Sequence, residues 1–139
     1  MTKEIILYDY PRSSAAYRVR IALNLKGIHY QQVHVDLINK DHNSDFYLAT
    51  NPQGLVPSLT IGDQIITQSM AIIEWLDETY PLQPLLPCDP MEKAQLRAQA
   101  YTIACDTHPL NNLRVLNYLI NDMGHNEDEK MVWYHHWIK

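Results

Sequence analysis

The sequence predicts an α/β domain of element order βαβ–ββα, followed by a helical segment. Three observations indicate this. Residues 4–35 show a strand, helix and strand pattern, residues 56–80 show two short strands and a helix, and four prolines in 81–90 precede a long helical pattern. A strand–helix–strand unit of about 30 residues makes its two strands parallel. The whole order is that of a thioredoxin-like domain.

The first three elements follow from hydrophobic spacing. Residues 4–8 contain the apolar run Ile-Ile-Leu, which is typical of a central strand covered on both faces. A helix is expected from Ser14 to about Lys26, with Gly27 as the residue that ends it. Residues 29–35 then alternate between apolar and polar side chains, which predicts a second strand.

The connection and the hairpin have clear turn signals. Residues 45–49 predict a short helix with Phe46 and Leu48 facing inward. Strands are expected over 56–61 and 64–67, joined by a tight turn at Gly62-Asp63. Ser69 is expected to cap the next helix, which Pro81 stops.

The predicted domain boundaries follow from the prolines. Residues 1–81 form the α/β domain, 82–90 an extended linker and 91–139 a partial all-helical domain. Apolar residues at helical spacing run from Met91 to about Met123, with a kink expected at Pro109. A further helix is expected from Glu127 to Lys139.

Composition excludes several classes of function. The 139-residue chain carries a formal net charge of −5, which argues against nucleic acid as a partner. No segment reaches the roughly 18 uninterrupted apolar residues of a membrane helix. Cys88 and Cys105 form no C-x-x-C pair, and the histidines show no metal-binding spacing, so we expect reduced thiols, no metal and a cytoplasmic location.

Ser13 and Ser14 stand where the first helix begins. The first N–H groups of a helix lack partners within it, and its dipole places partial positive charge there. An anion such as a thiolate is stabilised at this position. The alternative is that one of the two serines is only a helix cap.

Two further stretches suit a peptide-like ligand. The proline of Val56-Pro57 enters a strand at a turn and is expected to be cis, which leaves the backbone of Val56 able to pair with a ligand. The alternative is an ordinary proline at the start of a strand. Gln68-Ser69 begins the third helix, where a hydroxyl and free N–H groups suit a carboxylate. Here too the alternative is a cap, and both roles can coexist.

Together these motifs resemble the glutathione transferases, most closely the zeta class, which includes the maleylacetoacetate isomerases. The zeta signature Ser-Ser-Cys-Ser-x-Arg-Val-Arg is similar to Ser13-Ser14-Ala15-Ala16-Tyr17-Arg18-Val19-Arg20. The other similar stretches are 21–27, 51–57, 68–74, 85–87, 108–116 and 133–138. The resemblance therefore runs through nearly the whole chain.

The resemblance implies a fold, a cofactor and a reaction. It implies a thioredoxin-like domain and a truncated all-helical domain, a homodimer, and glutathione-dependent cis–trans isomerisation of an unsaturated diketo acid in tyrosine and phenylalanine catabolism. The implied catalytic residues are Ser13 and Ser14. The implied glutathione-binding residues are Ser13, Ser14, Arg18, Val56, Pro57, Gln68, Ser69, His108, Asn112 and Arg114.

Two departures from the family pattern keep alternatives open. Ala15 replaces the signature cysteine, and the chain is shorter than the two-domain family, so it is expected to be a shortened relative or part of a longer chain. One alternative is a general glutathione transferase acting on another small-molecule electrophile. The other is a remnant that binds glutathione or a partner protein without turnover.

Overall fold

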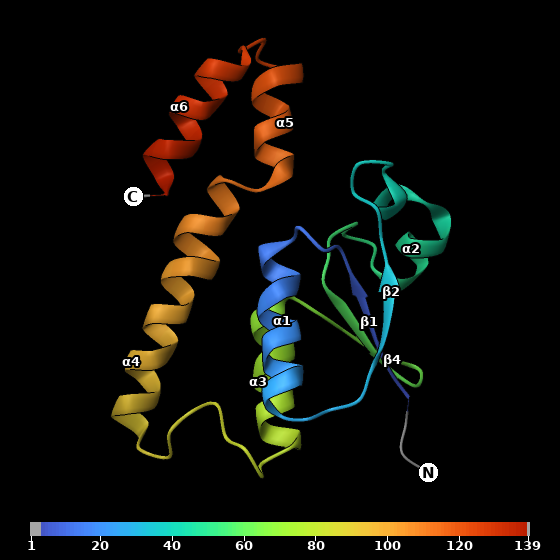
Figure 1. Cartoon of the computed structure of the whole chain (residues 1–139), viewed down its shortest axis with the longest axis vertical. Helices are drawn as coiled ribbons and strands as arrows, with labels where there is room; N and C mark the ends of the chain where they lie inside the picture. The colour runs from blue at the N-terminus through green and yellow to red at the C-terminus, as the bar shows by residue number, and fades with distance from the viewer. Residues whose placement is uncertain (1–3, 139) are drawn as a thin grey trace. The chain divides into compact units, whose positions relative to one another are not determined.

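Four strands form a mixed sheet in the first part of the chain (Figure 1). The structure is a computed structural model that describes residues 4–138. The strands are β1 (Ile5–Asp9), β2 (Gln31–His34), β3 (Ser58–Ile61) and β4 (Gln64–Thr67). Their order is β2-β1-β3-β4, with β1 parallel to β2 and antiparallel to β3, and with β3 antiparallel to β4. The thioredoxin-like order predicted from the sequence is confirmed.

Helices supply the other elements, and they differ in length and type. The α-helices are α1 (Ser14–Leu25), α2 (Asp45–Thr50), α3 (Ser69–Thr79), α4 (Pro90–Tyr101), α5 (Leu113–Asn121) and α6 (Glu127–Trp137). Two 3₁₀ turns, η1 (Asp41–Asn43) and η3 (His108–Leu110), and a π-helix, η2 (Thr102–Thr107), complete the set. The chain divides into two compact units, Met1–Leu86 and Pro87–Lys139. Lys139, expected to end the last helix, lies outside the described residues.

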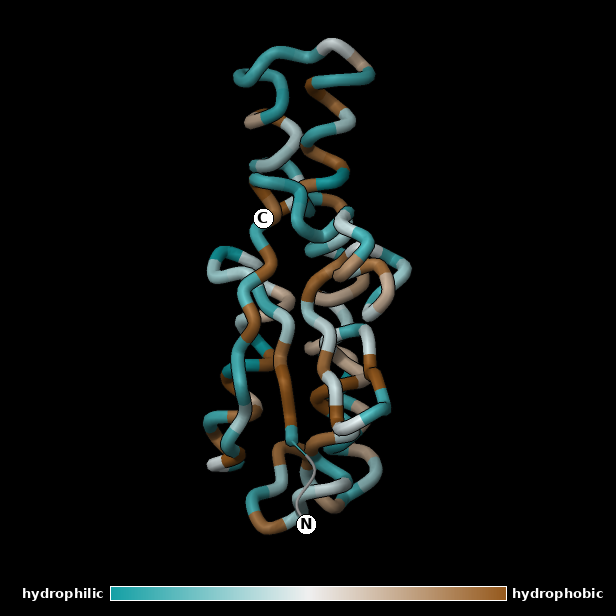
Figure 2. The backbone as a smooth tube through the Cα atoms, turned by 90° about the vertical axis from the view of Figure 1, so that its right-hand side faces the viewer, coloured by the Kyte–Doolittle hydropathy of each residue, from teal (hydrophilic) through white to brown (hydrophobic). Residues whose placement is uncertain are grey.

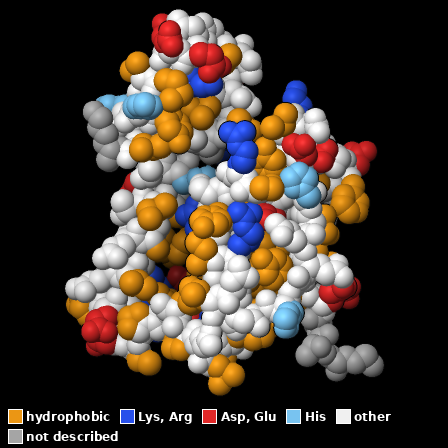
Figure 3. Space-filling model, in the orientation of Figure 1, with side chains coloured by type: hydrophobic (Ala, Val, Ile, Leu, Met, Phe, Trp, Pro, Cys, Tyr) orange, Lys and Arg blue, Asp and Glu red, His pale blue; other side chains and the backbone are white. Residues whose placement is uncertain are grey.

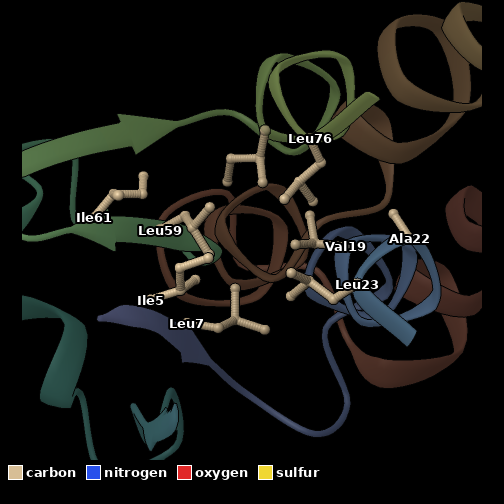
Figure 4. Packing of buried hydrophobic residues seen from close by; sticks show 9 residues of the cluster. Ile5, Leu7, Val19, Ala22, Leu23, Leu59, Ile61 and Leu76 are labelled. Carbon is tan, nitrogen blue, oxygen red and sulfur yellow. The ribbon is translucent and has the colours of Figure 1, made fainter. Parts of the chain in front are cut away.

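The core of the first unit lies between the sheet and the pair α1 and α3, which lie side by side (Figures 1 and 4). Side chains from β1, β3 and both helices point into this layer; the buried ones are Ile5, Leu7, Val19, Ala22, Leu23, Leu59, Ile61, Ile72 and Leu76. Figure 2 shows β1 as a hydrophobic run just after the N-terminal trace. Full burial of one such side chain contributes about 1.5–3 kcal/mol, so this layer holds α1 and α3 against the sheet.

Lys26 links the end of α1 to α3 and to the segment that follows α3. Its side chain is 1% exposed, and its Nζ lies 2.7 Å from Oδ1 of Asp77. It also donates to the carbonyl oxygens of Tyr80 and Gln83, each at 2.9 Å. Asp77 in turn accepts from the backbone N–H groups of Leu85 and Leu86, which follow the end of α3. The segment after α3 is therefore held by an ion pair and backbone hydrogen bonds, although it has no regular secondary structure.

The expectation for α2 is partly wrong. Phe46 was expected to face inward, but its side chain is 72% exposed, whereas Tyr47 is 1% exposed. Leu48 is half-buried, in keeping with the expectation. Tyr47 rather than Phe46 is buried because the Tyr47 hydroxyl hydrogen-bonds to the carbonyl of Leu55 and to Oγ of Ser58. Phenylalanine has no hydroxyl and could not form these bonds.

The expected long helix over 91–123 is also wrong, because it is broken rather than kinked. The chain passes from α4 through the π-helix η2 and the 3₁₀ turn η3 before α5 begins. The α-helix already ends at Tyr101, and Pro109, which has no N–H and whose ring conflicts with the carbonyl four residues earlier, prevents it from resuming before Asn112. Asn112 then starts a new helix, since its side chain accepts from the N–H of Val115 at 3.1 Å.

In the second unit, α5 and α6 pack together. Two hydrogen bonds with α6 residues hold the segment between η3 and α5 in place. The indole N–H of Trp133 donates to the carbonyl of Leu110 at 2.9 Å, and the side-chain amide of Asn111 donates to the carbonyl of Tyr134 at 3.2 Å. Figure 3 shows hydrophobic side chains on the surface of this unit. The exposed large hydrophobic residues of the unit include Leu113, Tyr118, Met131, Val132 and Trp137. Within residues 4–138, no helix is long and apolar enough to cross a membrane.

Candidate functional site

The strand register brings the three predicted ligand-binding stretches to one edge of the sheet. Tyr8 of β1 pairs with Ser58 of β3, and Ser58 pairs with Thr67 of β4. The loop to Ser13 follows β1, Val56-Pro57 directly precedes β3, and Gln68-Ser69 directly follows β4. Segments far apart in the sequence therefore meet at the edge where α1 and α3 both begin.

Ser13 is the N-cap of α1, so one of its two interpretations is confirmed. Its Oγ accepts a hydrogen bond from the N–H of Ala16 at 3.2 Å. A hydroxyl that accepts one hydrogen bond still has its own hydrogen to donate. The first turn of α1 contains no acidic side chain, so the positive end of the helix dipole stays uncompensated by charge. Ser14 is the first residue of the helix and is exposed.

A buried carboxylate holds the loop that carries Ser13, and sequence analysis missed it. Asp9 is 0% exposed, and its Oδ2 lies 2.5 Å from Nη1 of Arg20 and accepts from the side-chain amide of Gln32. Arg20 also donates to the carbonyl of Pro11 at 3.2 Å. The guanidinium therefore ties the end of β1, the loop and α1 together. The available signal was an acidic residue in an otherwise apolar strand.

The peptide bond between Val56 and Pro57 is cis, as the sequence analysis expected. Pro57 is buried and Val56 is half-buried. Val56 lies outside β3, whose register with β1 begins at Ser58. Its backbone therefore lies just before β3 at the sheet edge, where a ligand backbone would pair with it.

Gln68 and Ser69 occupy the start of α3 in an unusual conformation. Gln68 has φ 72° and ψ 117°, a backbone conformation that residues other than glycine rarely adopt. Ser69 was expected to be the cap, but Gln68 is the N-cap residue and Ser69 is the first residue of the helix, only 8% exposed. The amide of Gln68 lies 3.4 Å from the side-chain oxygen of Gln53, which links α3 to the loop before Pro57.

The remaining predicted residues lie farther along α1 or in the second unit. Arg18 is half-buried on α1. His108 lies in η3, Asn112 caps α5, and Arg114 is exposed in the first turn of α5. Among residues 4–138, no group of three or more His, Cys, Asp or Glu side chains is arranged to hold a metal ion.

The fold and the arrangement at this edge define a class of protein. The family described as glutathione S-transferase, N-terminal domain, matches residues 7–84, and the chain belongs to this family. This confirms the resemblance found in the sequence.

Individual relatives extend the similarity beyond that domain. A probable maleylacetoacetate isomerase of Vibrio cholerae is 49% identical over 137 residues, covering 96% of this chain and 63% of the relative. A holo structure of a maleyl pyruvate isomerase, described as a bacterial zeta-class glutathione S-transferase, has a TM-score of 0.93 and 46% identity, covering 96% of this chain and 63% of that one. A maleylacetoacetate isomerase of Methylobacterium extorquens with bound malonate and glutathione has a TM-score of 0.91 and 45% identity, covering 94% and 62%. The chain thus spans about 63% of the length of the first two proteins.

Proposed function

We propose that this chain binds glutathione at the sheet edge and belongs to a glutathione-dependent cis–trans isomerase of maleylacetoacetate type. The observation that carries the proposal is the register Tyr8–Ser58–Thr67, which gathers the three predicted ligand-binding stretches. The similarity to isomerases that carry glutathione in their structures supports the same conclusion.

The residues at this edge fit glutathione. Its γ-glutamyl carboxylate suits the start of α3, where the nearly buried hydroxyl of Ser69 and the first N–H groups of the helix offer donors. The strained backbone of Gln68 is consistent with a binding role, because such strain concentrates where ligands are held. Val56 would pair with the cysteinyl backbone in the manner of an added strand.

Ser13 would hold the sulfur in its charged form. A free thiol has a pKa near 8.5. A hydroxyl donor and a helix N-terminus contributing up to about 2 kcal/mol would lower that pKa by about 1.5. Glutathione, when bound, would supply a thiolate for addition to a conjugated double bond and later elimination, with rotation about the single bond in between. The role of the chain is to orient this thiol and to place the N-terminus of α1 beside it.

The substrate and assembly are proposed from the same resemblance. An unsaturated diketo acid carries carboxylate charge, which suits Arg12 or Arg18. The second-unit residues His108, Asn112 and Arg114 are proposed, from the same resemblance, to bind glutathione. We propose a homodimer, a cytoplasmic location and a place in tyrosine and phenylalanine catabolism. The exposed hydrophobic side chains of the second unit favour self-association, because large apolar patches on isolated chains commonly mark interfaces.

Titration calorimetry with glutathione tests the binding step. Saturable binding is expected, and Ser69→Ala should weaken it about ten- to a hundredfold because a hydrogen bond to a carboxylate is lost. Thr79→Ala is the matched control, since Thr79 is exposed at the opposite end of α3. The absence of binding at millimolar glutathione would overturn the proposal.

Parallel assays on a cis-diketo acid and a halogenated acid test the reaction. Isomerisation of the former supports the proposed class. Turnover of only the halogenated acid would indicate a general transferase, and binding without either reaction would indicate a binding protein.

A further inference from the structure

Two buried side chains, one on α2 and one on its C-cap residue, converge on one backbone carbonyl. The hydroxyl of Tyr47 donates to the carbonyl oxygen of Leu55 at 2.6 Å, and the side-chain amide of Asn51 donates to the same oxygen at 2.7 Å. Both side chains are 1% exposed. They are four residues apart, which places them on the same side of the helix end. A carbonyl oxygen has two lone pairs, so both acceptor positions of Leu55 are used.

The direction of the hydrogen bonds around Tyr47 can be worked out. Its Oη also lies 3.0 Å from Oγ of Ser58, and geometry alone leaves the donor open. The carbonyl of Leu55 can only accept, so it takes the single hydroxyl hydrogen of Tyr47. Ser58 must therefore donate to Tyr47, and the chain runs from Ser58 to Tyr47 to Leu55. Each bond in such a chain polarises the next.

This anchoring fixes the peptide plane that contains the N–H of Val56. The bond between Leu55 and Val56 is trans, and the C=O and N–H of a trans peptide unit point in opposite directions. Because Leu55 directs its carbonyl into the protein, the N–H of Val56 points away from Tyr47 and Asn51. Donors to the carbonyl also withdraw electron density through the peptide unit, which makes the N–H a stronger donor.

We propose that Tyr47 and Asn51 are positioning residues that aim the N–H of Val56 at the cysteinyl carbonyl of glutathione. This rests on the proposed function, and it adds two side chains that touch no part of the ligand themselves. Burial raises the pKa of the Tyr47 phenol, so the hydroxyl stays protonated and remains a donor across the physiological range. Asn51 also fixes the turn before Leu55, since its Oδ1 accepts from the N–H of Gln53 at 3.0 Å.

NMR of the full chain separates positioning from a general effect on folding. Tyr47→Phe removes only the hydroxyl, and Tyr80→Phe is the matched control, a half-buried tyrosine distant along the chain from this loop. In the free protein, Tyr47→Phe should change the carbonyl carbon shift of Leu55 and the amide shift of Val56. With glutathione, it should reduce the ligand-induced shift of the Val56 amide and weaken binding about three- to tenfold. The ligand-induced shifts of Gln68 and Ser69 at saturation should persist.

A second ligand pair tests the atom that Val56 should contact. The amide of γ-glutamylcysteine has the cysteinyl carbonyl, whereas γ-glutamylcysteamine lacks it. Tyr47→Phe should weaken binding of the amide of γ-glutamylcysteine. γ-Glutamylcysteamine should cause little shift of the Val56 amide in the unmodified chain or in Tyr47→Phe. Ser58→Ala, which removes the donor to Tyr47, should reproduce the Val56 effect more weakly.

The outcomes distinguish this inference from the proposed function. Equal losses for both ligands, with the shifts at Gln68 and Ser69 also reduced, would mean that Tyr47 serves only the fold. Unchanged Leu55 and Val56 shifts in free Tyr47→Phe would overturn the anchoring itself. If the unmodified chain shows no glutathione-induced shift anywhere, the proposed function fails, and the free-state shifts still decide whether Tyr47 orients this peptide.

Discussion

Replacing Asp77 by asparagine should destabilise the first unit in a pH-dependent way. The carboxylate faces the ammonium of Lys26 at 2.7 Å and accepts from the N–H groups of Leu85 and Leu86 at 2.6 and 3.1 Å. Asparagine can still accept from a backbone N–H, but it leaves the buried ammonium without its counter-charge. The loss of one hydrogen-bonded charge interaction corresponds to about 1.5–3 kcal/mol of unfolding free energy at pH 7.

The sign of the pH dependence follows from the surroundings of Asp77. Burial alone would raise the pKa of Asp77, but the hydrogen bond from Lys26 and the two backbone N–H donors outweigh burial and hold that pKa below its ordinary value of 3.8. A lowered folded-state pKa stabilises the protein above the unfolded-state pKa, and this stability is lost as pH falls through the folded-state value. The destabilisation by Asp77→Asn should therefore be constant from about pH 5 to 7 and shrink below about pH 4.

Urea unfolding followed by the amide signal of Leu59 reports the first unit alone, because Leu59 is fully buried in its core. Measurements at pH 7, 5 and 3.5 would cover the range in which the carboxylate titrates. Glu78→Gln is the matched control, since Glu78 is the next residue of α3 and is exposed. A penalty equal to that of Glu78→Gln, or one that does not change with pH, would refute the reasoning.

Three further predictions concern the helix starts and the buried pair. Ser13→Ala should slow isomerisation about ten- to a hundredfold at neutral pH and less at high pH, because a lost donor raises the pKa of the bound thiol; an equal, pH-independent loss in Ser14→Ala would mean that the donor is wrongly assigned. Asp9→Asn should lower the unfolding free energy of the first unit by about 3 kcal/mol, because it leaves a largely buried guanidinium without its carboxylate partner, and a loss below about 1 kcal/mol in urea unfolding would contradict this. Asn126→Ala should reduce α6 stability by about 1 kcal/mol, measured by amide exchange. The backbone N–H of Asn126 donates to the Glu129 carboxylate and lowers the pKa of Glu129, so the stability that this second bond of the capping box gives should be lost as pH falls through that lowered value; amide exchange in α6 that stays constant at acid pH would speak against the capping box.

Local sequence signals located most of the candidate site. Serines at a helix start, a proline at a strand entry and a Gln-Ser pair before a helical pattern each have a local physical meaning, so they could be recognised without coordinates. The cis bond at Pro57 is confirmed, and so is the cap at Ser13. The roles in ligand binding remain predictions for Ser13, Val56, Gln68 and the other named residues.

Long-range pairing decided what local patterns could not. The sequence analysis expected Phe46 rather than Tyr47 to face inward, yet the partners that bury Tyr47 lie 8 and 11 residues away in sequence. The partners of Asp9 lie 11 and 23 residues away, so no local window shows why a carboxylate is buried there.

The sequence by itself determined the order of the elements, the thioredoxin-like class and the family resemblance, because hydrophobic period and turn chemistry act over a few residues. Only the tertiary structure decided that the chain from α4 to α5 breaks into separate helices, and that the carbonyl of Leu55 turns inward so that the N–H of Val56 turns out. The orientation of that one peptide depends on side chains from α2, which the fold brings to the sheet edge.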